Sequence, residues 1–212
     1  MQTFDRVAIK TEAKRIFNQY RSLCVSMALL VTVASVILTS VSAGFLSVLL
    51  DGVITVTAAG FFLLCWRERP CSVSEAISDT FDNGFLRKLG GMLWMTLKVF
   101  LWSLLFIIPG IIKAMSYFLT PYILAEFPDV PAMEACEISE RMMRGHRMDL
   151  FVTELSFLGW SLLSALTFGI VYVLYAGPYM QLTYAGIYEE LKQLALDQGI
   201  VTADELGARP EA

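Results

Sequence analysis

The chain has 212 residues, of which 56% are hydrophobic and 17% are charged, and its mean hydropathy is +0.61. Soluble domains carry about 25% charged residues. Two long stretches, Ser22 to Leu50 and Leu155 to Tyr188, contain no charged residue. Since about 20 apolar residues cross a hydrocarbon core, the composition excludes an ordinary soluble domain and predicts an all-α membrane protein.

The net charge of −4 includes no basic block, so nucleic acid is not an expected partner. The chain has four cysteines, none in a C-x-x-C pair, and a single histidine, His146. These residues do not predict a metal site, and no cofactor-binding motif is present. His146 lies in a charged turn and is interpreted as a cap or surface group rather than a catalyst.

Hydropathy predicts six transmembrane helices, arranged as three hairpins. The expected spans are about 23–45, 52–66, 92–108, 111–125, 150–166 and 170–190. Each hairpin is preceded by a short or amphipathic helix on the cytoplasmic side. Residues 1–192 are thus predicted to form a single membrane domain, and residues 193–212 a polar, mobile C-terminal tail.

Three short helices are expected before the hairpins. Residues 3–20 place apolar side chains on one face and a basic row beside it, which predicts a helix lying in the membrane interface or a basic anchor for the first span. Ser72-Val73-Ser74-Glu75 matches a capping box and predicts a helix that ends near Asn83-Gly84. Pro131 is expected to begin the third short helix, on which Glu137–Arg141 and Glu140–Arg144 have the i,i+4 spacing of ion pairs.

The connections are predicted from turn residues. The first outer turn lies at Ser42-Ala43-Gly44 or at Asp51-Gly52, and the sequence leaves both open. Pro109-Gly110 is expected to form the second outer turn, and Gly169 marks the third. Asp149 is expected to cap the fifth span, and Gly177-Pro178 to kink the sixth without ending it.

The basic residues predict the topology, because Lys and Arg are retained on the cytoplasmic side. With both termini inside, 14 of the 16 basic residues fall in inner segments. The exceptions are Lys98 and Lys113, which lie in or beside spans. The inner residues are Arg6, Lys10, Lys14, Arg15, Arg21, Arg67, Arg69, Arg87, Lys88, Arg141, Arg144, Arg147, Lys192 and Arg209.

Two segments share a spacing pattern. Ile77-Ser78 precedes Gly84 as Ile138-Ser139 precedes Gly145, and Trp102-Ser-Leu-Leu is matched by Trp160-Ser-Leu-Leu. This indicates three parallel units, each an inner helix followed by a membrane hairpin. The alternative is that hairpins entering from one side need similar caps, and the sequence does not decide between them.

Four runs carry a family resemblance. They are Trp102 to Ile111, Tyr117 to Leu124, Met142 to His146, and Leu155 to Trp160. Through them the chain resembles domain-of-unknown-function family 975, which consists of uncharacterised bacterial integral membrane proteins. The resemblance implies a multi-helix protein of the bacterial plasma membrane, and it carries over no catalytic residue.

Ionisable residues inside the predicted spans are the candidate site. Lys98 lies near the middle of the third span, and Glu154 lies in the fifth. With Lys113 they predict a polar site between helices, because intramembrane charges usually point to the bundle interior. The simpler alternative, which we favour, is that the lysine ammonium groups reach the interface.

These patterns predict a non-enzymatic scaffold or interaction protein of the plasma membrane, with both termini cytoplasmic. Its expected partners are membrane lipids and, through self-association or hetero-association, other membrane proteins. The alternative is a small transporter or permeation unit with a polar site between helices.

Overall fold

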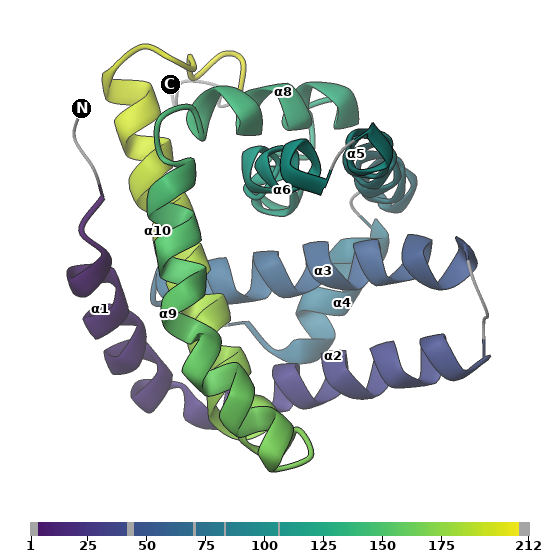
Figure 1. The fold of residues 1–212 in the computed structure, drawn as a ribbon, viewed down its shortest axis with the longest axis vertical. Helices are drawn as coiled ribbons and strands as arrows, with labels where there is room; N and C mark the ends of the chain where they lie inside the picture. The colour runs from purple at the N-terminus through teal and green to yellow at the C-terminus, as the bar shows by residue number, and fades with distance from the viewer. Residues whose placement is uncertain (1–3, 42–44, 70, 83, 106, 208–212) are drawn as a thin grey trace.

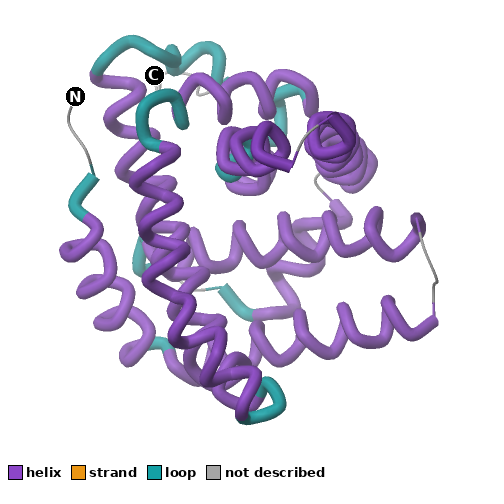
Figure 2. Tube along the Cα trace, in the orientation of Figure 1, coloured by secondary structure: helices purple, strands orange, loops and turns teal. Residues whose placement is uncertain are grey.

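The computed structural model describes residues 4–41, 45–69, 71–82, 84–105 and 107–207. Within these ranges the secondary structure is entirely helical, and the helices are joined by short turns (Figure 2). The all-α prediction is therefore confirmed for the described part of the chain. The elements are α1 (Arg6–Gln19), α2 (Arg21–Val41), α3 (Phe45–Trp66), α4 (Val73–Asp82), α5 (Phe85–Leu105), α6 (Ile107–Ser116), α7 (Thr120–Glu126), α8 (Ala132–Met142), α9 (Arg147–Leu166), the π-helical segment η1 (Tyr172–Ala176) and α10 (Gly177–Asp197).

The longer helices run in three directions (Figure 1). In that view α2 and α3 lie across the molecule, α9 and α10 run roughly vertically, and α5 and α6 are seen nearly end-on. Among the described residues three stretches are long and apolar enough to cross a membrane: Arg21–Ser40, Ile108–Glu126 and Arg147–Leu166. Leu50–Trp66 is apolar but shorter. The structure thus supports three of the expected spans by length and composition.

Helix α1 begins where Asp5 caps it, accepting hydrogen bonds from the amides of Val7 (2.9 Å) and Ala8 (3.1 Å). One of the two interpretations of residues 3–20 placed its apolar face in the membrane interface. In the structure that face is buried against protein, and α1 packs on α10. The apolar periodicity predicts the helix and its buried face, but this face forms a contact inside the protein. The buried residues are Ile9, Ala13, Ile16 and Phe17.

Helix α3 lies at the centre and contacts α2, α4, α5, α7 and α10. Its second half is buried almost all round: Phe61, Phe62 and Leu63 are each exposed by 2% or less. Asp51-Gly52, one of the two candidate turns, lies inside this helix, where a missing Cβ permits close approach to the Met92 side chain. That alternative is wrong, and the other, Ser42-Ala43-Gly44, lies outside the described residues.

Pro109-Gly110 does not form a turn but lies in the first turn of α6. Proline is tolerated there because the first amides of a helix have no intrahelical partner. Gly110 is needed because α6 packs closely on α5: a Cβ at this position would lie 2.2 Å from Ser103 Oγ and 2.9 Å from Ser103 Cα. The glycine therefore reflects helix contact rather than chain reversal.

The predicted fourth span is divided into α6 and α7, with Tyr117–Leu119 in a turn between them. Ser139, on α8, accepts a hydrogen bond from the Leu119 amide (3.2 Å) and donates one to the Ser116 carbonyl (2.9 Å). These bonds satisfy backbone groups that the break would otherwise leave buried without partners.

The capping box before α4 is confirmed. The Ser72 amide donates to the Glu75 carboxylate (2.7 Å), and the Glu75 amide donates to the Ser72 hydroxyl (3.2 Å). The cap expected at Asp149 is not formed: His146 occupies the N-cap of α9 without a side-chain bond, and Asp149 lies in the first turn. A carboxylate there still favours the positive end of the helix dipole.

The turn after α9 forms as predicted, with Gly169 at φ +83° and its amide bonded to the Ser164 carbonyl (2.8 Å). Before Gly177-Pro178 the chain adopts the π-helical geometry of η1 and then continues into α10. A π turn accommodates a residue that cannot continue the regular hydrogen-bond ladder. The helix is thus altered at Gly177-Pro178 without being ended.

The C-terminal segment is more ordered than the polar tail that the sequence predicts. Helix α10 continues to Asp197, and beyond it Val201 and Leu206 are 1% and 3% exposed. The Arg141 guanidinium contacts the Glu205 carboxylate at 3.0 Å. Residues 198–207 therefore pack against the helical core through α8.

The contact between α5 and α6 gives a direct test. Gly110→Ala should lower the free energy of unfolding by about 1–3 kcal/mol, because its methyl group overlaps the backbone of Ser103. Gly159→Ala is the matched control: it lies in α9 and its Cβ would meet no atom within 4 Å. Thermal unfolding of both variants in detergent checks the prediction. Equal midpoints for the two would show that α5 and α6 are not so closely packed.

Candidate functional site

Four charged side chains alternate in sign at the meeting point of α3, α7 and α10. Glu126 Oε1 lies 2.6 Å from Arg67 Nη2 and 2.9 Å from Lys192 Nζ. Glu189 pairs with Arg67 Nε and lies 2.9 Å from Lys192. The Tyr188 hydroxyl donates to the second oxygen of Glu126 at 2.5 Å. We call Arg67, Glu126, Tyr188, Glu189 and Lys192 the charge hub.

The charge hub is largely withdrawn from solvent. The side chains of Glu126, Glu189 and Lys192 are 13–14% exposed, and that of Arg67 is 30% exposed. Desolvated charges are stable when each has opposite charges and hydrogen bonds around it, and here each acid contacts two bases. Since the partners come from three distant parts of the chain, the network holds α3, α7 and α10 together.

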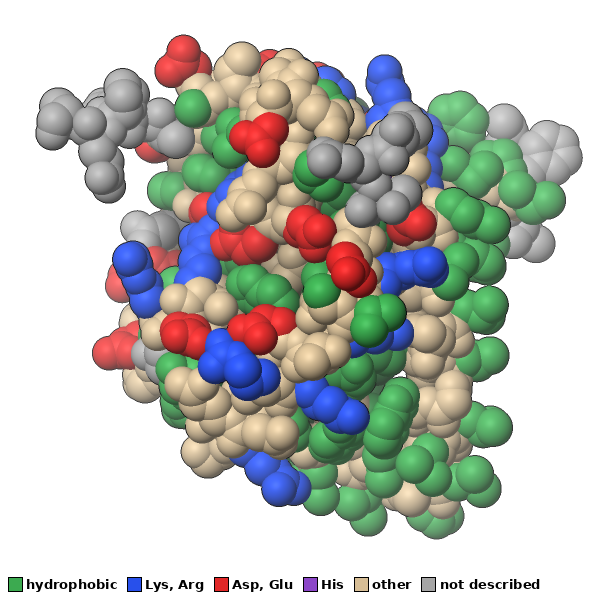
Figure 3. All heavy atoms as spheres, turned by 90° about the vertical axis from the view of Figure 1, so that its left-hand side faces the viewer, with side chains coloured by type: hydrophobic (Ala, Val, Ile, Leu, Met, Phe, Trp, Pro, Cys, Tyr) green, Lys and Arg blue, Asp and Glu red, His purple; other side chains and the backbone are tan. Residues whose placement is uncertain are grey.

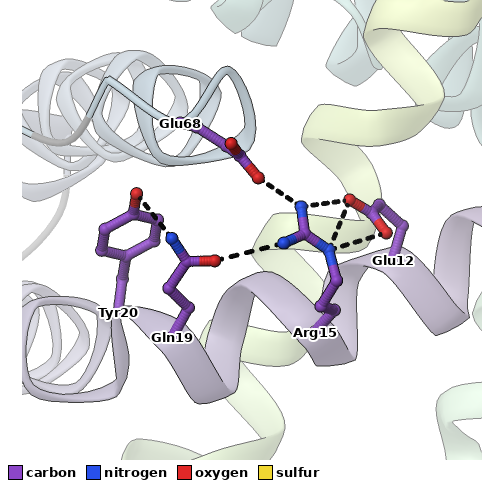
Figure 4. A network of polar contacts seen from close by, with 5 residues as sticks. All are labelled: Glu12, Arg15, Gln19, Tyr20 and Glu68. Atoms are coloured by element: carbon purple, nitrogen blue, oxygen red, sulfur yellow. Dashed lines mark hydrogen bonds and ion pairs between the residues drawn. The ribbon is translucent and has the colours of Figure 1, made fainter.

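A second network, shown in Figure 4, lies at the surface and contrasts with the charge hub. Arg15 of α1 donates to Glu12 at 2.6 Å, reaches Glu68 after α3, and donates to Gln19 at 3.2 Å. Its side chain is 50% exposed, and that of Glu12 is 42% exposed. Pairs this exposed are screened by water and contribute little to stability.

Arg67 and Glu126 of the charge hub form part of the wall of a polar cavity. The cavity, of about 370 Å³, lies among α3, α4, α5 and α7. Its charged lining consists of Arg67, Glu75, Asp79, Lys88 and Glu126. The arrangement offers both cationic and anionic groups to a ligand, and among the described residues no group of His, Cys, Asp and Glu is placed to hold a metal.

Lys88 is the most buried charge in the cavity wall, with its side chain 3% exposed. Its ammonium lies 3.4 Å from the Asp79 carbonyl and 3.7 Å from the Asp79 carboxylate. Burial lowers the pKa of Lys88, and the Asp79 charge opposes that shift. The neighbouring Arg87 points elsewhere, donating to the carbonyls of Val130 (2.6 Å) and Leu124 (2.7 Å).

The predicted residues Lys98 and Lys113 share one aromatic neighbour. Their ammonium groups lie 5.4 and 5.5 Å from the ring centroid of Tyr117. Lys98 also lies over Trp94 (5.3 Å), and Lys113 pairs with Glu140 at 2.6 Å. Aromatic faces stabilise such cations where water is scarce.

Glu154, the third predicted residue, lies beside the side chains of Tyr122 and Tyr184. The contacts of Lys98 are with Trp94 and Tyr117, so the structure brings the two lysines together and places Glu154 among other residues. His146 is 7% exposed and its ring faces Phe4 and Asp149, at 3.9 Å from the Asp149 carboxylate.

Sequence reasoning missed the charge hub. Arg67 and Glu126 were interpreted as the polar residues at which spans end, and Glu189 and Lys192 as part of the polar exit of the last one. The sequence nevertheless contains a usable signal. One apolar segment is followed by the basic Arg67, another ends at the acidic Glu126, and the last ends at Glu189 and Lys192, so bases and acids are both available for pairing. Their mutual pairing depends on tertiary structure.

Residues 104–195 match the family described as Protein of unknown function (DUF975). The resemblance predicted from the sequence is confirmed over this segment. The DUF975 segment contains Glu126, Tyr188, Glu189 and Lys192 of the charge hub, while Arg67 and Lys88 precede it. Searches of curated proteins and of solved structures give no match.

The charge hub predicts a large effect for one substitution. Glu126→Gln removes the acid shared by Arg67 and Lys192, and should lower the free energy of unfolding by roughly 3 kcal/mol, as expected when one partner of a buried pair is lost. Glu12→Gln removes a half-exposed acid and should cost less than about 1 kcal/mol. Chemical unfolding in mixed micelles measures both. Similar losses for the two variants would contradict a buried hub.

The Lys113–Glu140 pair predicts a pH dependence. Burial acts to raise the pKa of Glu140, but hydrogen bonding and charge from Lys113 lower it overall. A carboxylate with a lowered pKa in the folded state contributes stability above its unfolded pKa of about 4.3, and this is lost as pH falls. The difference in unfolding midpoint between the native chain and Glu140→Gln should therefore shrink below about pH 4.

Exposed Glu137→Gln, on the same helix, controls for removing a carboxylate. A midpoint difference for Glu140→Gln that stays constant across the acidic range would contradict the pairing with Lys113.

Proposed function

We propose that this protein is a non-enzymatic membrane scaffold or interaction protein of the bacterial plasma membrane. Its apolar helices, in the three pairs α2–α3, α5–α6 and α9–α10, lie in the bilayer, and both termini are cytoplasmic. The charge hub joins α3, α7 and α10, and the polar surface around it faces the cytoplasm.

The observation that carries the proposal is the exposure of large apolar side chains on all three helix pairs. Such surfaces far exceed the scattered apolar residues of soluble monomers and need a lipid environment. The residues include Leu29, Val33, Val36 and Ile37 on α2; Leu97, Phe100, Leu101, Leu104 and Ile108 on α5 and α6; and Leu155, Leu158, Leu162 and Leu166 on α9; each is 48–74% exposed.

The distribution of charge supports the same reading. Figure 3 views the side on which α1 lies, where acidic and basic side chains gather over much of the face while hydrophobic side chains line the right-hand edge. Basic residues cluster before and between the apolar pairs, as cytoplasmic segments do. The apolar turn around Phe168, which is 99% exposed, suits the opposite side.

The transporter alternative has weaker support. The sequence favoured it through the possible repeat and a polar site at Lys98, and Lys98 and Glu154 have separate neighbours. The polar cavity lies instead beside α4, next to the charge hub. A binding role for the cavity fits a scaffold better than a path through the bilayer.

Cysteine labelling tests the topology. On a Cys71→Ser background, Phe168→Cys should react with a membrane-impermeant maleimide in intact spheroplasts, and Asp204→Cys only after permeabilisation. Cys24, Cys65 and Cys136 are buried and should remain unlabelled. Extraction at alkaline pH should leave the chain in the membrane pellet. Release into the supernatant, or the reverse labelling pattern, would refute the proposal.

A further inference from the structure

An apolar groove of about 700 Å³ runs between α2 and α3 and is closed at one end by α4 and the start of α5. Apart from two threonines its lining is hydrophobic, and it includes Leu30, Ile37, Ile54 and Phe85. Both its volume and that of the polar cavity fall in the range of about 300–1,000 Å³ found for ligand sites. A groove of this kind between membrane helices fits hydrocarbon rather than a polar substrate.

The groove and the polar cavity meet. Thr57 of α3 and Thr80 of α4 line both, and their hydroxyls lie 2.8 Å apart. Along α3 the groove is lined by residues 50–57 and the cavity by residues 56–67, so the apolar part passes directly into the charged part. On α4 the groove is bounded by Ile77 and Phe81, and the cavity by Asp79 and Glu75. Together they form an elongated site with one apolar and one charged end.

The dimensions match one membrane leaflet. From Leu50 to Arg67 the chain advances about 26 Å at about 1.5 Å per helical residue. Half of a bilayer of about 40–45 Å, headgroups included, is about 20–22 Å. A single phospholipid is a few Å shorter than this span, so its acyl chain can lie in the groove while its headgroup reaches the cavity.

Charge distinguishes among headgroups. Lys88 is buried, yet the acceptors that the described residues offer its ammonium are both longer than an ordinary hydrogen bond of about 2.9 Å. A phosphate would supply the close acceptor that a desolvated ammonium needs. The carboxylates of Glu75 and Asp79 also line the cavity, and their oxygens can accept hydrogen bonds from a primary ammonium.

We propose that this joined site binds one zwitterionic phospholipid with a primary ammonium in its headgroup. The acyl chain lies in the α2–α3 groove, the phosphate is held by Lys88, and the ammonium faces Glu75 and Asp79. This inference rests on the proposed function, because it requires that the helix pairs lie in a bilayer with their charged ends toward the headgroups.

The test uses the full chain, purified in mild detergent and mixed with phosphatidylethanolamine, phosphatidylcholine or phosphatidylglycerol of identical acyl chains. Native mass spectrometry counts the lipid retained. The ethanolamine lipid should be retained most, since the choline headgroup has no N–H donor and the glycerol headgroup has no cation. Lys88→Gln should reduce its retention on the order of tenfold, as expected for loss of a charge-assisted hydrogen bond.

Two further variants separate the parts of the site. Ala34→Phe narrows the groove without touching Lys88, and should also reduce retention. Lys98→Gln removes a lysine from the same helix that lines neither cavity, and should retain the lipid as the native chain does. Thermal unfolding without added lipid shows whether each variant is folded.

Several results would overturn the proposal: equal retention of all three lipids, no change with Lys88→Gln, or equal loss with folded Lys98→Gln. Equally tight binding of glycerophosphoethanolamine, which lacks acyl chains, would assign the cavity to a soluble compound instead. These outcomes are independent of the alkaline extraction, which tests membrane embedding. A chain that stays in the membrane but retains no lipid would refute the site and leave the proposed function standing.

Discussion

The charge hub is the interaction on which the arrangement of the helices depends. Apolar surfaces on α3, α7 and α10 pack with little directional preference, whereas desolvated acids and bases are stable only where opposite charges surround them. Arg67 lies 59 residues from Glu126 and 122 residues from Glu189 in the sequence, so each contact closes a long segment of chain. The hub thus selects which helix ends meet, while the buried second half of α3 supplies the apolar contact around it.

Local structure was predictable because its determinants are close in sequence. The Ser72–Glu75 capping box and Gly169 satisfy backbone groups within a few residues, and both lie where the sequence indicates. Pro109-Gly110 was misread because one dipeptide has two compatible explanations. A proline suits both a turn and the first turn of a helix, and a glycine suits both a reversal and a close helix contact. The close approach of Ser103 on α5 shows that Gly110 serves a helix contact. This approach is a tertiary contact, which the sequence pattern does not reveal.

The candidate site was predictable only in part, for a related reason. Lys98 and Lys113 stand out because they interrupt apolar segments, and the structure does bring them together around Tyr117. Arg67 and Lys88 do not stand out, because charges at the ends of apolar segments are what any membrane topology requires. Arg67 is paired with Glu126 and Glu189, and Lys88 is covered by α4, a short amphipathic helix whose position against α3 and α5 follows from tertiary packing.

The position of α4 also explains why a charged cavity and an apolar groove adjoin. This amphipathic helix, set against two longer ones, presents Ile77 and Phe81 to the apolar groove and Asp79 to the polar cavity. Thr80, 3% exposed, lies on the border, and its bond to Thr57 fixes the register of α4 on α3. A headgroup in the cavity would then lie beside Arg67 and Glu126, which separate it from Glu189 and Lys192. Lipid occupancy and the packing of the three helix pairs would in that case be coupled through the same charges.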